Sequence, residues 1–230
     1  MSATRVLVVA DERQIHGFLK PALTAGGYQV QIAKTGRGAL KLIATTPFNI
    51  VFLDLDLSNM DGAKVLRKIR TYSKIPIIVL SARTQEAEKV QALDAGADDY
   101  LEKPCGIDEL MARLRVALRH TAHERRDPAQ ISSGGLRVNF AKRSVTKNGV
   151  AVKLTPKEYD FLVMLARHAG RPLTHRQILT AVKGPDHRDN TQYLRVFIGQ
   201  LRAKIEEDPS TPRLILTEHG VGYRFADLDP

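Results

Sequence analysis

The sequence predicts two domains: a doubly wound α/β domain with a five-stranded parallel sheet, and a winged helix-turn-helix domain after it. Two observations lead to this. Short apolar runs alternate with helical spacing through the first half, and three amphipathic helices followed by a hairpin pattern fill the second. A chain of 230 residues that is 43% apolar is long enough for two domains of ordinary size.

Five strand and helix units can be followed through the first half. Residues 6–9, 50–53 and 77–80 are apolar runs with the length of buried strands, and residues 28–32 and 99–101 are short strand-like segments. Each is followed by apolar residues at helical spacing, and Asp61 is placed to cap the third helix. Because strands that alternate with helices pair in parallel, these units form a doubly wound parallel sheet with helices on both faces.

Polar residues follow three of these strands directly. The run at 50–53 leads into Asp54 and Asp56, the run at 6–9 is followed by Asp11, and the run at 77–80 by Ser81. A single aspartate after a strand is usually only a turn residue. Since parallel strands bring their carboxyl ends to one edge of the sheet, where ligands bind, the combination predicts a site there.

Residues 121–130 are charged, contain Pro128 and lack an apolar period, which predicts a linker or a frayed helix end between domains at 1–120 and 131–230. The net charge is +10. Residues 1–120 hold 17 basic and 13 acidic residues, and residues 121–230 hold 18 and 12. The more basic second domain is typical of a protein that binds a polyanion.

The second half begins with expected strands at residues 136–140, 144–147 and 150–153, the last two joined by the hairpin signal Asn148-Gly149. Capping boxes starting at Thr155 and Thr174 open two helices. A third helix at 191–206 has a core stripe and an exposed basic and amide face, and residues 214–225 predict a hairpin. Such a helix fits the DNA major groove, and the hairpin tip can reach the adjacent groove.

Several blocks in order carry a family resemblance: Leu80-Ser81-Ala82-Arg83, the segment at 92–101, Lys103-Pro104, and Gly222-Tyr223-Arg224-Phe225. With them, the chain resembles two-component response regulators of the OmpR/PhoB family along nearly its whole length. The segments at 114–119 and 193–195 are most similar to the KdpE type, which regulates a potassium-uptake operon.

The resemblance implies a DNA-binding transcription regulator switched by phosphorylation. A sensor histidine kinase would phosphorylate Asp54, and Mg²⁺ would be held by Asp11, Asp54 and the backbone carbonyl of Asp56. Such a transfer to a carboxylate needs a divalent cation and a fixed ammonium. Lys103 would be that ammonium, Ser81 would donate its hydroxyl to the phosphoryl group, and Tyr100 would swing inward behind it.

The resemblance also implies macromolecular partners: a second copy of the chain, RNA polymerase and double-stranded promoter DNA. The implied dimer contacts in the receiver domain are Lys89, Asp99, Glu109 and Arg113.

In the second domain, basic residues would contact the phosphates of the DNA backbone, and glutamines could read the edge of an adenine base. The implied DNA-binding residues are Arg176, Gln192, Tyr193, Arg195, Val196, Gln200, Arg202, Thr217 and His219.

Four positions depart from the family pattern. Ala10 replaces the first of two adjacent acids, which predicts weak Mg²⁺ binding and slow phosphorylation. Ser58 replaces a usual proline and is expected to loosen its loop. Cys105 replaces an aromatic residue, and a redox role would need a cation besides Lys103 to lower its pKa. Lys183 replaces a frequent tryptophan, either as a phosphate contact or, as we favour, as a solvated residue.

The composition sets further limits. The single cysteine forms no internal disulfide, and there is no run of about 18 apolar residues and no signal peptide, so we expect a cytoplasmic protein without a membrane partner. The histidines lack ligand spacing and are expected at the surface without a metal; they include His168, His175, His187 and His219.

Three other readings stay open. The segment Asp54-Leu55-Asp56 has the form used by haloacid-dehalogenase phosphatases, whose first aspartate is a nucleophile. That motif normally follows the first strand, whereas here it follows the third, so we do not expect an enzyme. A transcription factor of the same fold that switches without phosphate is permitted by Ala10, and a partner protein with vestigial domains is the third reading.

Overall fold

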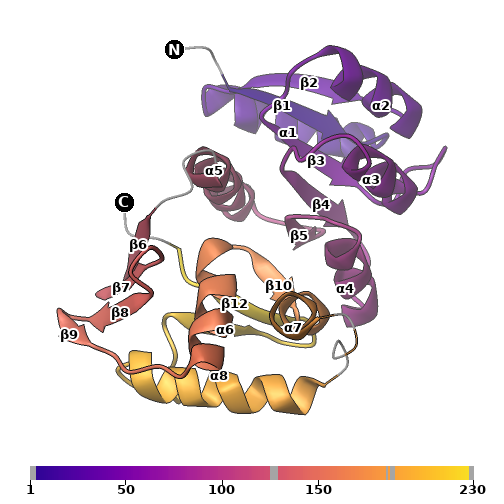
Figure 1. Cartoon of the computed structure of the whole chain (residues 1–230). Helices are drawn as coiled ribbons and strands as arrows, with labels where there is room; N and C mark the ends of the chain where they lie inside the picture. The colour runs from indigo at the N-terminus through magenta and orange to yellow at the C-terminus, as the bar shows by residue number, and fades with distance from the viewer. Residues whose placement is uncertain (1–3, 125–128, 185, 187–189, 228–230) are drawn as a thin grey trace. The chain divides into compact units, whose positions relative to one another are not determined.

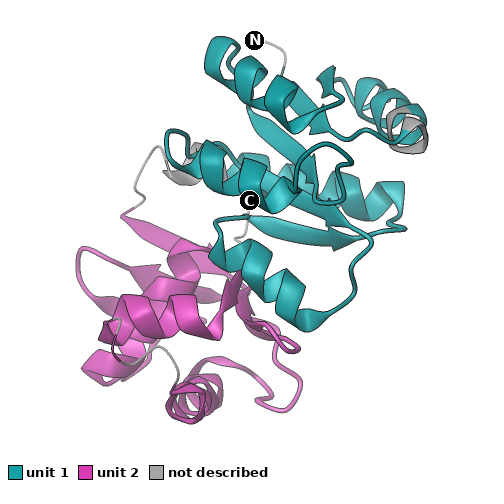
Figure 2. Cartoon of the chain, turned by 90° about the vertical axis from the view of Figure 1, so that its right-hand side faces the viewer, with its two compact units in different colours: residues 1–121 teal, residues 122–230 magenta. Residues whose placement is uncertain are grey.

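The computed structural model describes residues 4–124, 129–184, 186 and 190–227. The chain divides into two compact units, residues 1–121 and residues 122–230 (Figure 2).

The first unit contains the expected five-stranded parallel sheet in the order β2-β1-β3-β4-β5 (Figure 1). Its strands are β1 (Arg5–Val9), β2 (Gln29–Ala33), β3 (Ile50–Asp54), β4 (Ile77–Ser81) and β5 (Asp99–Glu102). The connecting helices are α1 (Arg13–Ala25), α2 (Gly36–Thr45), α3 (Gly62–Arg70), α4 (Glu86–Asp94) and, after β5, α5 (Ile107–Glu124). Helix α5 thus includes residues 121–124 of the expected linker.

The continuous apolar strands are explained by burial on both faces of this sheet. Helices α1 and α5 cover one face, and the core there includes Val8, Leu19, Phe52, Ile78, Leu110 and Leu114. The alternate strand residues, such as Leu7 and Val79, are also fully buried, under the layer formed by the other helices. Helix α3 begins as predicted, since the Asp61 side chain accepts a hydrogen bond from the N–H of Ala63.

The register of the sheet brings the ends of three strands together. Leu53 of β3 lies beside Val9 of β1, and Asp54 lies beside Leu80 of β4. The loops after β1, β3 and β4 therefore start at the same edge, as the sequence predicts.

The second unit opens with a four-stranded antiparallel sheet in the order β6-β7-β8-β9. Its strands are β6 (Gln130–Ser133), β7 (Leu136–Asn139), β8 (Ser144–Lys147) and β9 (Val150–Ala151). Asn148 and Gly149 have φ values of 50° and 82°, both positive as a type I′ turn requires, which confirms the hairpin. Strand β6 begins inside the expected linker and was not predicted.

The helices and the wing complete this unit (Figure 1). They are α6 (Pro156–Arg167), α7 (His175–Lys183), α8 (Thr191–Ile205) and the hairpin β11 (Ile215–Glu218) with β12 (Gly222–Phe225). Both predicted capping boxes are present, on Thr155 and Thr174. A short strand that was not predicted, β10 (Pro172–Thr174), pairs with β12, so the three-stranded sheet has the order β10-β12-β11.

Candidate functional site

Asp54, the last residue of β3, is fully buried and lies against the ammonium of Lys103, which follows β5. The Nζ atom of Lys103 is 3.0 Å from Oδ1 and 2.9 Å from Oδ2 of the carboxylate. The N–H of Asp56 donates to Oδ1 at 2.9 Å. The sheet thus places a fixed positive charge on both oxygens of the aspartate.

The environment shifts the pKa values of this pair. Burial raises the pKa of Asp54 above its ordinary value, although the Asp56 N–H and Lys103 favour the charged form. Burial alone would lower the pKa of Lys103, but its hydrogen bonds to Asp54 and Glu12 outweigh burial and raise it. Lys103 is therefore a permanent cation at neutral pH, held where new negative charge on Asp54 would develop.

Asp11 and Glu12 contribute from the loop after β1. Oδ2 of Asp11 accepts from the N–H of Ser58 at 2.7 Å, and hydrogen bonds from Ser58 lower the pKa of Asp11. A proline at position 58 has no N–H to donate. Ser58 therefore gives this loop a hydrogen bond to Asp11 that proline would not, and the expectation that Ser58 loosens the loop stays a prediction.

Glu12 reaches the site through Lys103, with Oε1 at 3.2 Å from Nζ. Sequence reasoning gave Glu12 no role, because it lies one position beyond the acids of the family pattern. The only feature of the sequence that could have predicted a role for Glu12 in the site is that it is an acidic residue next to Asp11.

Asp56 uses its side chain in the loop after β4. Its carboxylate accepts from Oγ of Ser81 at 3.3 Å, from the N–H of Ala82 at 3.1 Å and from Nε of Arg83 at 2.9 Å. Although burial opposes it, the Ala82 and Arg83 contacts lower the pKa of Asp56. Arg83 stood in a recognised sequence block but was assigned no function.

Tyr100 of β5 is already buried in this structure, with 3% of its surface exposed. Its hydroxyl donates to the carbonyl oxygen of Arg83 at 2.7 Å. The side chain expected to swing inward lies inward in this structure, attached to the loop that Asp56 also holds.

Gly62 shows how closely α3 approaches the site. A Cβ at this position would lie 2.5 Å from the backbone oxygen of Asp54 and 2.6 Å from Cα of Leu55. The N–H of Gly62 donates to the oxygen of Leu55 at 3.2 Å. Only a residue without a side chain permits this contact, which fixes the loop after β3.

The expected dimer contacts are largely tied within one chain. Arg113 lies 3.2 Å from Asp99 and 3.7 Å from Glu109, and the Lys89 ammonium is 6.0 Å from the centre of the Tyr100 ring.

Burial raises the pKa of the Cys105 thiol. A thiol in this state is a poor nucleophile, which argues against a redox role.

The second unit exposes most of the expected DNA-binding residues. On α8, Gln192, Arg195, Val196 and Gln200 are exposed, and Tyr193 is half-buried. Arg176 of α7 is exposed, as are Thr217 and His219 of the wing. The core stripe of α8 is buried as predicted: Leu194, Ile198, Leu201 and Ile205.

Arg202 does not share this exposed position. It is half-buried, and its Nε and Nη2 atoms donate to the carbonyl oxygen of Ile215 at 3.0 and 2.6 Å. Nη2 also donates to Oγ1 of Thr217 at 2.8 Å. Nε and Nη2 of Arg202 thus join α8 to the wing, and its expected contact with DNA stays a prediction.

Lys183 and His175 each lie against a tyrosine ring. The Lys183 ammonium lies 3.2 Å from the centre of the Tyr193 ring, so this partly exposed residue makes a cation–π contact that the sequence did not predict. His175 is half-buried with its ring edge-on to Tyr223, and burial lowers its pKa. His168 is half-buried, His219 is exposed as expected, and His187 lies outside the described residues.

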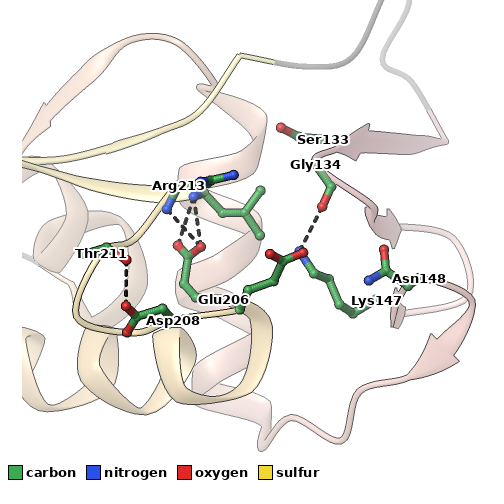
Figure 3. Close-up of a pocket in the computed structure, with 10 residues that line it drawn as sticks. Ser133, Gly134, Lys147, Asn148, Glu206, Asp208, Thr211 and Arg213 are labelled. Carbon is green, nitrogen blue, oxygen red and sulfur yellow. Dashed lines mark hydrogen bonds between the residues drawn. The ribbon is translucent and has the colours of Figure 1, made fainter.

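A polar cavity of about 410 Å³ lies beside the end of α8 (Figure 3). The Glu206 carboxylate accepts from the backbone N–H groups of Arg213, Leu214 and Ile215. Asp208 accepts from the hydroxyl of Thr211 at 2.7 Å. These contacts shape the loop before β11.

Comparisons with known proteins agree with both units. The family described as response regulator receiver domain matches residues 6–115, and the family described as transcriptional regulatory protein, C terminal, matches residues 149–225. Transcriptional regulatory protein KdpE of Mycobacterium tuberculosis is 49% identical over 223 residues, which is 96% of this chain and 99% of that protein. The chain belongs to the OmpR/PhoB family of two-component response regulators.

This response regulator is also similar to the KDP operon transcriptional regulatory protein KdpE of Escherichia coli, at 46% identity over 96% of the chain and 99% of that protein. Among solved structures, the response regulator DrrB of Thermotoga maritima, an OmpR/PhoB homologue, matches with a TM-score of 0.51 and 28% identity. That match covers 98% of this chain and all of DrrB.

The chain is therefore a KdpE-like transcriptional regulator with a receiver domain and a DNA-binding domain. The receiver domain implies a sensor kinase as partner, and the second domain implies DNA binding. None of the helices in the described ranges is long and apolar enough to cross a membrane.

Proposed function

We propose that Asp54 of this regulator accepts a phosphoryl group from a sensor histidine kinase, and that this modification controls DNA binding by the second unit. The observation that carries the proposal is the Lys103 ammonium on both oxygens of a buried aspartate at a sheet edge. An ion pair that only stabilises the fold does not need to lie at the edge of the sheet with the cation on both carboxylate oxygens. Phosphoryl transfer does need a fixed cation beside the acceptor.

The transfer follows from the geometry of the carboxylate. Oδ1 accepts from both Lys103 and the Asp56 N–H, whereas Oδ2 accepts only from Lys103 among the hydrogen bonds of the described residues. Oδ2 is therefore the freer nucleophile. It attacks phosphorus, the bond from phosphorus to the kinase histidine nitrogen breaks, and Lys103 neutralises charge on the phosphoryl oxygens.

We infer that Mg²⁺ is held by the carboxylates of Asp11 and Asp54 and the backbone carbonyl of Asp56. This all-oxygen donor set fits Mg²⁺ in chemical type, and the ion supplies charge neutralisation when bound. In the described part of the chain, no three His, Cys, Asp or Glu side chains gather as a metal cluster. Two carboxylates, with Ala10 where a third acid is usual, support the proposal of weak affinity.

The modified regulator acts, in this proposal, as a cytoplasmic homodimer that binds a promoter and contacts RNA polymerase. Arg113 would have to exchange its contacts with Asp99 and Glu109 for contacts to the partner copy, and Lys89 lies near the same surface. Surface pairs of this kind set orientation more than affinity.

The DNA contacts we propose come from α7, α8 and the wing; Arg202, whose Nε and Nη2 atoms bind Ile215 and Thr217, would contact DNA only through the rest of its guanidinium. Similarity to two KdpE proteins, one of them titled as a regulator of the KDP operon, supports a potassium-transport operon as target. The proposed contacts are Arg176, Gln192, Tyr193, Arg195, Val196, Gln200, Thr217 and His219.

Acetyl phosphate labelling followed by intact mass measurement tests the phosphoacceptor. The parent should gain one phosphoryl group slowly, and only with Mg²⁺, whereas Asp54→Ala should gain none. Binding to the promoter of a neighbouring potassium-transport operon should tighten on labelling of the parent only. Rapid labelling at low Mg²⁺ would contradict the weak metal site.

The same experiment separates the other functions. If Asp54→Ala binds promoter DNA and activates like the parent, the regulator switches without phosphate, as Ala10 permits. Repeated turnover of a generic phosphate monoester would instead point to a phosphatase, whereas a single labelling event fits a regulator that is not an enzyme. An absence of specific DNA protection would leave only a partner protein with vestigial domains.

A further inference from the structure

The Asp56 side chain has no part in the transfer described above, which uses only its backbone. Yet its carboxylate accepts three hydrogen bonds, from Ser81, Ala82 and Arg83. Its Oδ2 atom also lies 3.8 Å from Nζ of Lys103. A partly exposed acid in a loop does not need this many partners, so the arrangement calls for a reason.

The donors that Asp56 occupies are those that a phosphoryl group on Asp54 would need. Ser81 ends β4 beside Asp54 and is fully buried, so its hydroxyl has few other acceptors. The N–H of Ala82 follows it, and Lys103 already contacts Asp54. Asp56 thus presents one anionic oxygen, Oδ2, to the hydroxyl, the N–H and the ammonium that would otherwise surround the phosphoryl oxygens, while its Oδ1 accepts from Arg83.

We propose that the Asp56 carboxylate takes the place of the phosphoryl group in the resting state, so that phosphorylation of Asp54 must displace it from Ser81 and Ala82. This inference rests on the proposed function of Asp54. Asp56 is a positioning residue, because it acts through Ser81, Ala82 and Arg83 and not on the reacting atoms.

Displacement of the Asp56 carboxylate can be transmitted to Tyr100 and helix α4 through the contacts of Arg83. Arg83 is held at Nε by Asp56 and at its carbonyl oxygen by the Tyr100 hydroxyl. Arg83 also lies 3.4 Å from Glu88, in the first turn of α4. When Asp56 releases Ser81 and Ala82, the backbone of Arg83 follows them, and the contacts to Tyr100 and α4 change with it.

Competition between the Asp56 carboxylate and the phosphoryl group for the same donors sets how strongly the phosphorylated state is favoured. Because hydrogen bonds to a charged acceptor are stronger than those to a neutral one, removing the charge of Asp56 should favour the phosphorylated state about tenfold or more. The variant Asp56→Asn keeps the shape and the backbone carbonyl. Glu88→Gln is the matched control, since it removes a carboxylate from Arg83 without vacating Ser81 or Ala82.

The test titrates beryllium fluoride, a phosphoryl mimic, into the full chain at saturating Mg²⁺, and follows the amide resonance of Ala82 by NMR. We expect Asp56→Asn to lower the half-saturating concentration about tenfold, with Glu88→Gln within about twofold of the parent. The Ala82 resonance should differ between parent and Asp56→Asn before addition, and coincide after it.

Each other outcome overturns the inference in a distinct way. If the parent responds but Asp56→Asn has the same half-saturation, Asp56 does not compete and only this inference fails. An equal gain in Glu88→Gln, or an unmoved Ala82 resonance in free Asp56→Asn, would show a general charge effect. If neither the parent nor any variant responds and acetyl phosphate leaves Asp54 unlabelled, the proposed function fails together with the inference.

Discussion

The guanidinium of Arg202 on α8 donates two hydrogen bonds to one acceptor, the carbonyl oxygen of Ile215 on β11. A basic residue on a recognition helix is commonly assigned to DNA, but this one closes the joint between the helix and the wing. Arg195, seven positions earlier on the same helix, is exposed and has the opposite role in our proposal.

Replacing Arg202 should therefore affect folding, and replacing Arg195 should affect binding. We expect Arg202→Met to lower the free energy of unfolding by about 1 to 3 kcal/mol in urea titrations, because the Ile215 carbonyl loses its donors. Arg195→Met should change it by less than about 0.5 kcal/mol. It should instead weaken promoter binding. The slope of the logarithm of the DNA-binding constant against the logarithm of salt concentration should fall in magnitude by about one, as expected for the loss of one phosphate contact. Equal stability of the two variants would contradict the assignment.

A methyl group at position 62 should disturb the phosphorylation site. In Gly62→Ala the new Cβ would collide with backbone atoms of Asp54 and Leu55, which cannot rotate away. We expect a loss of about 1 to 3 kcal/mol in the free energy of unfolding and slower labelling of Asp54. As a control, Gly199→Ala in α8 meets no atom within 4 Å and should gain about 0.5 to 1 kcal/mol from helix propensity. Urea unfolding measures both.

The pair of Glu158 and Lys204 should make the second unit sensitive to acid. Burial alone would raise the pKa of Glu158, but the Lys204 ammonium at 2.7 Å and the Thr155 N–H lower it below its ordinary 4.5. A depressed pKa in the folded state stabilises the protein above pH 4.5, and this stabilisation is lost as the pH falls through the folded pKa.

Lys204→Met should therefore cost about 1 to 2 kcal/mol of unfolding free energy at pH 7, with a cost that shrinks as the pH falls below 4.5. The double variant Glu158→Gln with Lys204→Met should recover part of the loss, since glutamine can still cap the helix. Urea midpoints at pH 7 and at pH values below 4.5 decide the matter. A cost that is independent of pH would show that the ion pair is not its source.

Cys105 should react slowly with alkylating reagents. Burial raises the pKa of its thiol above the ordinary 9.0, so little thiolate is present at neutral pH. We expect iodoacetamide to modify the native chain more slowly than the unfolded chain, with the rate still rising above pH 9. Fast modification at pH 7 would restore a redox function as a candidate.

Much of the fold follows from local pattern. The apolar runs of β1, β3 and β4, the capping boxes at Thr155 and Thr174 and the Asn148-Gly149 turn each depend on residues that are close in sequence. Strand β10 was not predicted because it has only three residues, the last of which is the helix cap Thr174, and this is too short a pattern. Strand β6 was not predicted because the charged residues before it indicated a linker.

The sequence by itself determined the order of the elements, the two domains and the position of Asp54, Asp11, Ser81 and Lys103 at strand ends. Tertiary structure alone decided the partners: Ser58 on Asp11, Glu12 on Lys103, Asp56 on the loop after β4, Arg202 on Ile215 and Lys183 on Tyr193. The physical reason is that periodicity and capping act over a few residues, whereas the choice of partner for a charged side chain depends on which distant backbone and side-chain groups the packed sheet and helices bring within reach.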